Sequence, residues 1–83
     1  MRSSFRQVGI RVWVPGGPAG GRGTTIAFVG QVPELGLGWW VGVDYDEPLG
    51  KNDGAIKGKR YFESDPQHGG FVRPSMVRFI TAF

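Results

Sequence analysis

The first half of the chain carries three segments whose apolar residues are typical of β-strands. Between residues 8 and 14, valine and isoleucine occupy every second position and alternate with glycine, arginine and tryptophan. A period of two is typical of a strand with one buried face. Residues 24–29 and 39–45 are rich in β-branched and aromatic residues, which favour strands. We therefore predict three strands over these ranges, the third of them preceded by a glycine-punctuated loop over residues 31–38.

The second half of the chain offers only shorter apolar runs. Strand candidates cover residues 60–62, 71–73 and 76–80, and the stretches between them have the Gly, Pro, Asp and Ser content of turns. No part of the chain keeps the 3.6-residue apolar period of an amphipathic helix. The pattern predicts an all-β fold, a small SH3-like barrel of about five or six short antiparallel strands, because closure of a barrel limits exposed sheet edges.

The size of the chain limits how this fold can be stabilised. With 83 residues and no cysteine, one compact domain without disulfides is expected. Such a domain needs dense packing, and three Trp, six Phe and two Tyr supply a large buried area per residue. We predict that residues 8–80 form the domain, that residues 1–7 are a flexible N-terminal segment, and that residues 81–83 are a C-terminal end outside the domain.

Charge and hydropathy bear on the partner and the compartment. Ten Lys and Arg against seven Asp and Glu give a net charge of +3 and a sequence pI near 9.8, which favours an acidic partner, whether peptide or nucleic acid. The longest uncharged apolar stretch, residues 39–43, is far shorter than the roughly 20 residues of a membrane helix. The N-terminus also lacks the apolar region of a signal peptide. Together with the absence of cysteine, these features predict a soluble cytoplasmic protein with no membrane partner.

The most informative motif is Gly50-Lys51-Asn52-Asp53-Gly54. Its two glycines permit backbone conformations closed to other residues and let a ligand backbone approach closely. Lys51 supplies a positive charge, and the Asn52 amide can both donate and accept hydrogen bonds, which suits an extended peptide and its carboxylates. Taken alone, however, Asn-Asp-Gly is more often simply a turn with positive φ. The motif can be interpreted only with its surroundings.

The segments around this motif resemble the rest of the CAP-Gly domain pattern, in the same order and at the same spacings. Residues 38–43 precede the loop, and residues 58–62 and 68–73 and Ser75 follow it. The resemblance covers about residues 8–79, which makes it far more specific than the loop alone. It implies an SH3-like barrel with a peptide groove, in a protein of tubulin folding or microtubule organisation that associates with the cytoskeleton.

The resemblance also implies a ligand. CAP-Gly domains take acidic C-terminal tails that end in Glu-Glu-Tyr or Glu-Glu-Phe, as found on α-tubulin and on some microtubule plus-end proteins. The expected partners are therefore the α-tubulin C-terminal tail and, as an alternative, plus-end-binding proteins. A buried terminal ring would then set the affinity, whereas exposed ion pairs would set selectivity and association rate.

Individual positions carry over to this chain from the family pattern. Trp40 and Phe71 match the aromatic walls of the pocket, while Lys51 and Asn52 match the residues that hold the acids and the chain end. Neighbours on a strand point to opposite faces, so we place Trp40 on the groove side and Trp39 at the rim. Two positions at the pocket rim depart from the common pattern: Leu35 lies where many relatives carry an aromatic residue, and Met76 lies where some carry a polar one. The full set of expected peptide-binding residues is Gly50, Lys51, Asn52, Asp53, Gly54, Trp40, Phe71, Arg73, Leu35 and Met76.

Three other classes of function are disfavoured. One His, no Cys and four scattered Ser give no nucleophile, base and orienting group with a recognisable spacing, so catalysis is not expected. His68 has no second His or Cys beside it, and no metal or cofactor is predicted. A basic nucleic-acid-binding barrel remains an alternative, but it is disfavoured because the basic residues are interleaved with seven acids.

Overall fold

The computed structural model describes residues 7–80. Residues 1–6 of the predicted N-terminal segment and the predicted end at 81–83 lie outside the described residues. The described part forms seven strands and one short 3₁₀ helix: β1 (Arg11–Pro15), β2 (Gly21–Val32), β3 (Gly36–Tyr45), β4 (Ala55–Ile56), β5 (Lys59–Arg60), β6 (Gly69–Val72), the 3₁₀ helix η1 (Pro74–Met76) and β7 (Arg78–Phe79).

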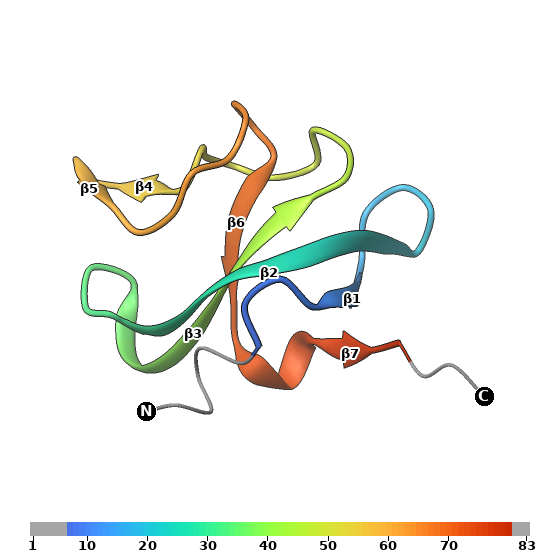
Figure 1. Ribbon diagram of the computed structural model, residues 1–83, viewed down its shortest axis with the longest axis horizontal. Coiled ribbons are helices and arrows are strands. Elements are labelled where there is room, and N and C mark those ends of the chain that lie inside the picture. Colours follow the sequence, from blue (N-terminus) through green and yellow to red (C-terminus); the bar gives the residue numbers. More distant parts are fainter. Residues whose placement is uncertain (1–6, 81–83) are drawn as a thin grey trace.

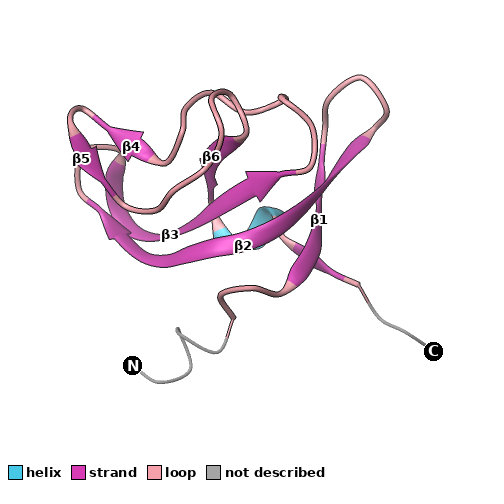
Figure 2. Ribbon diagram, turned by 45° about the horizontal axis from the view of Figure 1, so that its top comes forward, coloured by secondary structure: helices cyan, strands magenta, loops and turns pink. Residues whose placement is uncertain are grey.

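The strands form one larger sheet and one small hairpin. Five strands pair in the order β6-β3-β2-β1-β7, and every pairing in this sheet is antiparallel. Strands β4 and β5 form a separate two-stranded hairpin, which lies beside the β6 edge of the sheet (Figures 1 and 2). The predicted all-β, antiparallel fold is confirmed. The Cα radius of gyration of 12.0 Å is that expected of a single small domain.

Two strands are much longer than the sequence pattern predicts. Strands β2 and β3 contain 12 and 10 residues and continue their pairing to Val32 and Gly36. The predicted loop over residues 31–38 is therefore reduced to a tight turn, in which the Leu35 N–H donates to the Val32 carbonyl at 2.9 Å. The glycines in this stretch led to the prediction of a loop, because glycine in a strand often marks a bulge or a bend.

The first predicted strand is correct only in its second half. Val12 and Val14 are fully buried, whereas Val8 is 45% exposed and precedes β1. Gly9 has a φ of 94° and turns the chain before the ladder with β2 begins at Arg11. The period-two pattern of apolar residues therefore begins at Val8, before the pairing of β1 with β2 begins at Arg11.

The predicted strand over residues 76–80 is also shorter in the structure. Met76 belongs to η1, which begins at Pro74, and β7 starts only at Arg78. Proline is well suited to the first turn of a helix because its φ is fixed and it has no N–H to satisfy there. The chain therefore makes one helical turn before it pairs with β1.

An aliphatic core lies on one face of the larger sheet. Its members are mostly β-branched residues of the three central strands, which pack well on a pleated surface. Burying each such side chain contributes roughly 1.5–3 kcal/mol. The aliphatic core consists of Val12, Val14, Ile26, Val41, Val43, Tyr45 and Val77.

A register shift in β2 creates a second hydrophobic face. Ile26 pairs with Val43 and Phe28 pairs with Gly42, so Ala27 is an extra residue between two consecutive pairs. Without this bulge, Ile26 and Phe28 would lie on the same face, because side chains alternate along a strand. The bulge instead turns Phe28 to the face opposite the aliphatic core.

On that second face, four rings form what we call the aromatic cluster: Phe28, Tyr61, Phe62 and Phe71. Their centroids are 5.3–6.3 Å apart in edge-to-face or tilted pairs, which is the favoured geometry for aromatic rings. Gly42 provides the space, because a Cβ there would lie 2.6 Å from the Phe62 ring and 2.9 Å from the Phe28 Cβ. The cluster joins β2 and β6 to the chain that follows the β4–β5 hairpin.

Candidate functional site

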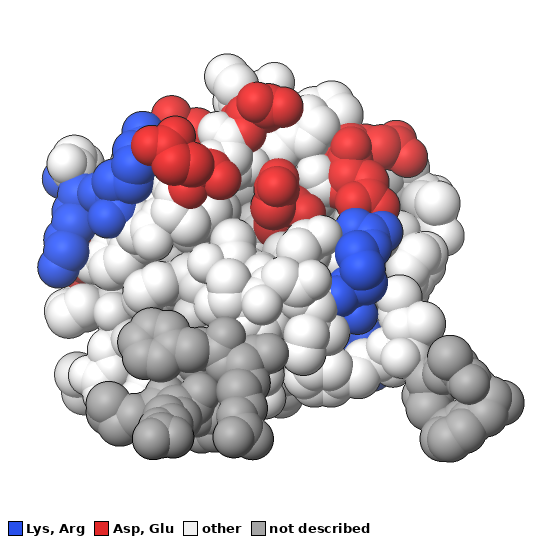
Figure 3. Space-filling model, in the orientation of Figure 1, with Lys and Arg blue, Asp and Glu red and all other residues white. Residues whose placement is uncertain are grey.

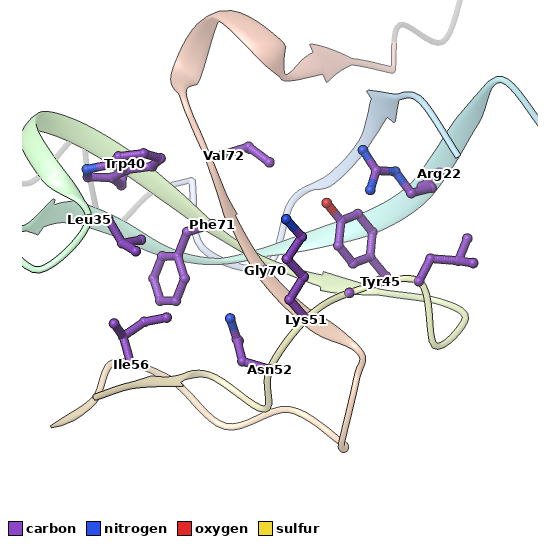
Figure 4. A pocket seen from close by; sticks show the side chains of 12 residues that line it. Arg22, Leu35, Trp40, Tyr45, Lys51, Asn52, Ile56, Gly70, Phe71 and Val72 are labelled. Carbon is purple, nitrogen blue, oxygen red and sulfur yellow. The ribbon is translucent and has the colours of Figure 1, made fainter. Parts of the chain in front are cut away.

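A groove of about 520 Å³ opens between the larger sheet and the loop that leads into the β4–β5 hairpin (Figure 4). A groove of this size falls in the range of ligand-binding clefts. Its lining residues are Arg22, Leu35, Trp40, Tyr45, Leu49, Gly50, Lys51, Asn52, Ile56, Gly70, Phe71 and Val72.

One end of the groove is apolar. Figure 4 shows Leu35, Trp40, Phe71 and Ile56 gathered there, from the β2–β3 turn, β3, β6 and β4 respectively. Phe71 belongs both to this wall and to the aromatic cluster, so the rings behind it fix its position. The apolar end is therefore shaped to take a large apolar side chain.

Trp40 is held rigidly in this wall. Its indole N–H donates to the Gly36 carbonyl at 3.1 Å, and the Arg73 guanidinium stacks on its ring at 3.8 Å. Arg73 in turn donates to the carbonyl oxygens of Leu37 and Trp39 at 2.8 and 3.1 Å. Arg73 thus positions Trp40, and it does not line the groove itself. Trp39 is 54% exposed and lies outside the lining, as strand alternation predicts.

The loop that carries Lys51 is joined to the start of β6. The N–H groups of Lys51 and Asn52 both donate to the Gly69 carbonyl, at 2.8 and 3.1 Å, and the Gly69 N–H donates back to the Asn52 carbonyl at 2.8 Å. This close approach requires glycine at position 50, because a Cβ there would overlap the Gly69 carbonyl oxygen. The loop is therefore rigid without any regular strand of its own.

The side chains of this loop present hydrogen-bond donors to the groove. The Asn52 Oδ1 accepts a hydrogen bond from the Gly54 N–H at 2.9 Å, which fixes the orientation of the amide. The Asn52 NH₂ group consequently remains to face a ligand as a donor. The Lys51 amino group forms no ion pair or hydrogen bond within residues 7–80, and Figure 4 shows it reaching over the middle of the groove.

The last two residues of the motif have structural roles. Gly54 has a φ of 101°, and a Cβ there would overlap the Phe62 carbonyl oxygen. Asp53 pairs with Arg60 at 3.3 Å, and the Arg60 guanidinium also donates to the Asp53 carbonyl at 2.9 Å. These contacts tie the loop to the hairpin that follows it.

A second polar group closes the other end of the groove. The Arg22 guanidinium lies 4.8 Å from the centre of the Tyr45 ring, and both residues line the groove. Burial raises the pKa of the Tyr45 phenol, and the positive charge of Arg22 partly offsets this rise. Tyr45 therefore stays neutral and provides a hydroxyl group beside two cationic side chains, Arg22 and Lys51 (Figure 4).

A hydrogen bond also links the β2–β3 turn to the aromatic cluster. The Tyr61 hydroxyl donates to the Glu34 carboxylate, which raises the pKa of Tyr61 to about 12 and lowers that of Glu34. The pair keeps Tyr61 in its neutral form across the physiological range. It also connects the turn that carries Leu35 to the rings that support Phe71.

The structure brings together six of the ten residues that the sequence assigned to the site. Gly50, Lys51, Asn52, Leu35, Trp40 and Phe71 line the groove. Four others lie outside its lining: Asp53, Gly54, Arg73 and Met76. Met76 is 41% exposed on η1.

Sequence reasoning missed six lining residues: Arg22, Tyr45, Leu49, Ile56, Gly70 and Val72. Tyr45 continues the period of Val41 and Val43, so the pattern indicates a core residue. It gives no indication that Tyr45 also lines the groove. Arg22 lies far from the motif in sequence, and the pairing of β2 with β3 brings it beside Tyr45. No signal in the sequence could have singled it out.

The described residues contain no cluster placed to hold a metal ion, and the face drawn in Figure 3 has no unbroken basic patch. Residues 7–80 contain no group of three or more His, Cys, Asp or Glu side chains placed to hold a metal ion. On the face drawn in Figure 3, acidic side chains lie between and above the basic ones. No helix within this range is long and apolar enough to cross a membrane.

Comparison with known protein families identifies the family of this chain. The CAP-Gly domain family model matches residues 8–77. The chain belongs to the CAP-Gly domain family. The resemblance inferred from residues 50–54 and their surroundings is thereby confirmed.

Relatives extend this result. Tubulin-folding cofactor B of Bos taurus is 50% identical over 66 residues, which cover 80% of this chain and 26% of the relative. Tubulin-specific chaperone B of Caenorhabditis elegans is 51% identical, covering 86% of this chain and 31% of the relative. Dynactin subunit 1 of Drosophila melanogaster is 46% identical, covering 92% of this chain and 6% of the relative. The chain thus spans less than a third of each of these relatives.

Solved structures show the same fold. The CAP-Gly domain of human kinesin-like protein KIF13B is 43% identical with a TM-score of 0.73, covering 90% of this chain and 70% of that one. A structure described as the Bik1 CAP-Gly domain with ETF peptide from Bim1 is 31% identical with a TM-score of 0.70. The match covers 92% of this chain and 87% of that one. The predicted SH3-like barrel of the CAP-Gly type is therefore confirmed.

Proposed function

We propose that this domain is a non-catalytic recognition module that binds acidic protein tails ending in Glu-Glu-Tyr or Glu-Glu-Phe. One observation carries the proposal: a single groove has an apolar aromatic end and, beside it, unpaired donors on Lys51 and Asn52. A ligand that ends in a ring and carries carboxylates just before it matches both features.

The two ends of the groove contribute differently to binding. A terminal ring between Trp40 and Phe71 is desolvated, and such an aromatic anchor contributes a few kcal/mol. The carboxylates meet Lys51 and the Asn52 NH₂ group close to solvent, where each ion pair contributes roughly 0–1 kcal/mol. The affinity expected of such a reversible contact is micromolar, about −8 kcal/mol.

The relatives support a source for the tail. One of them is named as a tubulin-folding cofactor and another as a tubulin-specific chaperone, and the Bik1 structure is described as containing an ETF peptide from Bim1. We therefore propose the α-tubulin C-terminal tail as the first partner and plus-end-binding proteins as the alternative. A protein with this domain would act in the cytoplasm, on the cytoskeleton, in tubulin folding or microtubule organisation.

The first test is a calorimetric titration with an eight-residue peptide that ends in Glu-Glu-Tyr and with the same peptide lacking the Tyr, each at two salt concentrations. We expect micromolar binding that is lost without the Tyr and weakens only gently with salt. A steep linear fall in log affinity with log salt, independent of the terminal ring, would instead favour a polyanion such as nucleic acid. Absence of binding by either peptide would overturn the proposal.

Substitution of the two donors separates binding from folding. Lys51→Gln and Asn52→Asp together should reduce affinity by more than tenfold, because one positive charge is lost and a negative charge replaces a donor. The aspartate keeps an oxygen to accept from the Gly54 N–H, so the thermal midpoint should change little. Lys57→Glu, on the hairpin turn outside the groove, lowers the net charge by the same two units and is the control, which should leave binding nearly unchanged.

A further inference from the structure

A second cavity of about 450 Å³ adjoins the groove. Its walls come from β1, the β1–β2 loop, the start of β2 and the segment that follows β3, through residues that include Trp13, Pro18 and Asp46. Arg22 and Leu49 line both this cavity and the groove. The two spaces therefore lie on either side of these two residues.

Arg22 is held at the junction by the protein but is not neutralised there. Its Nη2 donates to the Pro15 carbonyl at 2.9 Å, and its guanidinium lies 4.8 Å from the Tyr45 ring centre. Its Nε is buried and has no acceptor within the part of the chain that the structure describes. No carboxylate of residues 7–80 forms an ion pair with it. A guanidinium that is fixed, charged and unpaired is suited to a carboxylate ligand.

The other charges of the second cavity differ from Arg22. Arg11 and Asp46 form a bidentate pair with both N–O distances at 2.6 Å, so the charge of Arg11 is already compensated. This pairing lowers the pKa of Asp46. Glu47 adds a negative charge to the lining. Beyond Arg22, therefore, the cavity disfavours an acidic side chain.

Trp13 gives this cavity an apolar wall. Its indole packs directly on the backbone of Gly21, where a Cβ would overlap the ring. Trp13 nevertheless remains 43% exposed. A large exposed ring on a rigid strand is suited to contact with a bound chain.

We propose that the bound tail extends beyond the first groove: it passes between Arg22 and Leu49, places one carboxylate on Arg22, and continues as an uncharged segment over Trp13. This inference rests on the proposed function and adds a specificity-determining residue and a second subsite to it. The occupant is the same tail because Arg22 and Leu49 border both spaces.

The charge contact is tested by a double-mutant cycle. The parent peptide has eight residues, alternating Ala and Gly at the first four positions and then Glu-Glu-Glu-Tyr, and each Glu is replaced in turn by Gln. Arg22→Gln should weaken the parent about fivefold to tenfold, and should weaken the peptide that lacks the partner Glu less than twofold. Arg22→Lys should recover part of the loss, and Lys57→Gln should have no effect. Additive losses at all three glutamates would overturn the contact.

The second subsite is tested by peptide length. Removing the four N-terminal residues of the parent should weaken binding about threefold to tenfold in the unchanged domain, and less than twofold in Trp13→Ala. Trp39→Ala is the matched control, because Trp39 is also about half exposed but lines neither cavity. Equal affinities of the eight- and four-residue peptides for the unchanged domain would overturn the subsite.

These outcomes are distinguishable from failure of the proposed function. If the unchanged domain does not bind the parent peptide, the proposed function fails. If it binds the parent in a Tyr-dependent way but neither Arg22 nor Trp13 shows the expected coupling, only the extended site fails. Thermal midpoints of all variants show whether a loss of binding comes from unfolding, and Arg22→Lys remains informative if Arg22→Gln is unstable.

Discussion

The two hydrophobic regions of this domain, the aliphatic core and the aromatic cluster, are built in different ways. The core consists mainly of valine and isoleucine on strands that pair along their length, such as β2 with β3. The aromatic cluster instead joins β2 and β6 of the sheet to Tyr61 and Phe62, which follow a hairpin whose strands have two residues each. Where the backbone ladder is short, large rings supply the contact area instead.

This difference separates stability from recognition. The core lies on the face of the sheet away from Phe28 and contributes to the groove only through Tyr45. The cluster supports Phe71, which is itself a wall of the groove. Core substitutions should therefore change the free energy of unfolding, whereas cluster substitutions should change affinity at a smaller cost in stability.

The largest expected effect comes from the core. Ile26→Ala should lower the free energy of unfolding by about 2–5 kcal/mol, because Ile26 is 1% exposed and its loss leaves a cavity. Urea denaturation followed by tryptophan fluorescence measures this change. Affinity per folded molecule should stay within twofold of the unchanged domain. A tenfold loss of affinity at a temperature where the variant is folded would contradict the separation of the two regions.

Glycine substitutions around the hairpin give the next effect. Gly54→Ala should cost about 1–3 kcal/mol and abolish tail binding, because the new Cβ meets the Phe62 carbonyl at a positive φ. Gly58→Ala is the control: its φ is also positive, at 85°, but nothing lies within 4 Å of its Cβ. It should cost only about 1 kcal/mol and keep binding. Equal behaviour of the two variants in denaturation and titration would mean that backbone strain alone matters here.

A conservative change in the aromatic cluster should affect affinity more than stability. Phe62→Leu keeps an apolar side chain but removes a ring that packs on Phe71 at 5.4 Å. We expect a loss of about 1 kcal/mol in unfolding free energy and about a fivefold loss in affinity for the tail. Calorimetric titration beside urea denaturation measures both quantities. Unchanged affinity would show that the Phe71 wall does not depend on this support.

The smallest expected effect lies at the surface, in the Arg11–Asp46 pair. The pKa of Asp46 is lowered in the folded state, so its contribution to stability is present above the unfolded pKa of about 3.9 and is lost as pH falls through the folded value. Because both side chains are about half exposed, Asp46→Asn should cost less than about 1 kcal/mol at pH 7. The variant should also lose less stability than the unchanged domain between pH 5 and pH 2, as measured by urea midpoints.

Much of the fold was predictable from local pattern. The valines at 12, 14, 41 and 43 alternate with residues that face away, and all four are buried. The glycine loop at 50–54 and the order of its flanking segments indicated the family, which the family model confirms. These features are readable because a period of two and a requirement for glycine are properties of single residues and their neighbours.

The ends of the elements were less predictable. Residues 8–10 continue the period of β1 but lie before its ladder, and the glycines at 36 and 38 lie inside β3. In both places the neighbouring strand, not the local sequence, decides where pairing begins and ends. Local preference for the strand conformation is weak compared with the hydrogen bonds and packing that a partner strand provides.

The sequence by itself determined the composition of the site: a cationic, donor-bearing loop between two glycines, with aromatic residues on either side of it. Only the tertiary structure decided their arrangement. The bulge at Ala27 turns Phe28 away from Ile26 and toward Phe71, and the Gly69 carbonyl holds the N–H groups of Lys51 and Asn52. The pairing of β2 with β3 brings Arg22 beside Tyr45 at the end of the groove. Each of these depends on contacts between residues distant in sequence, and a one-residue shift of register would reverse the face that a side chain occupies.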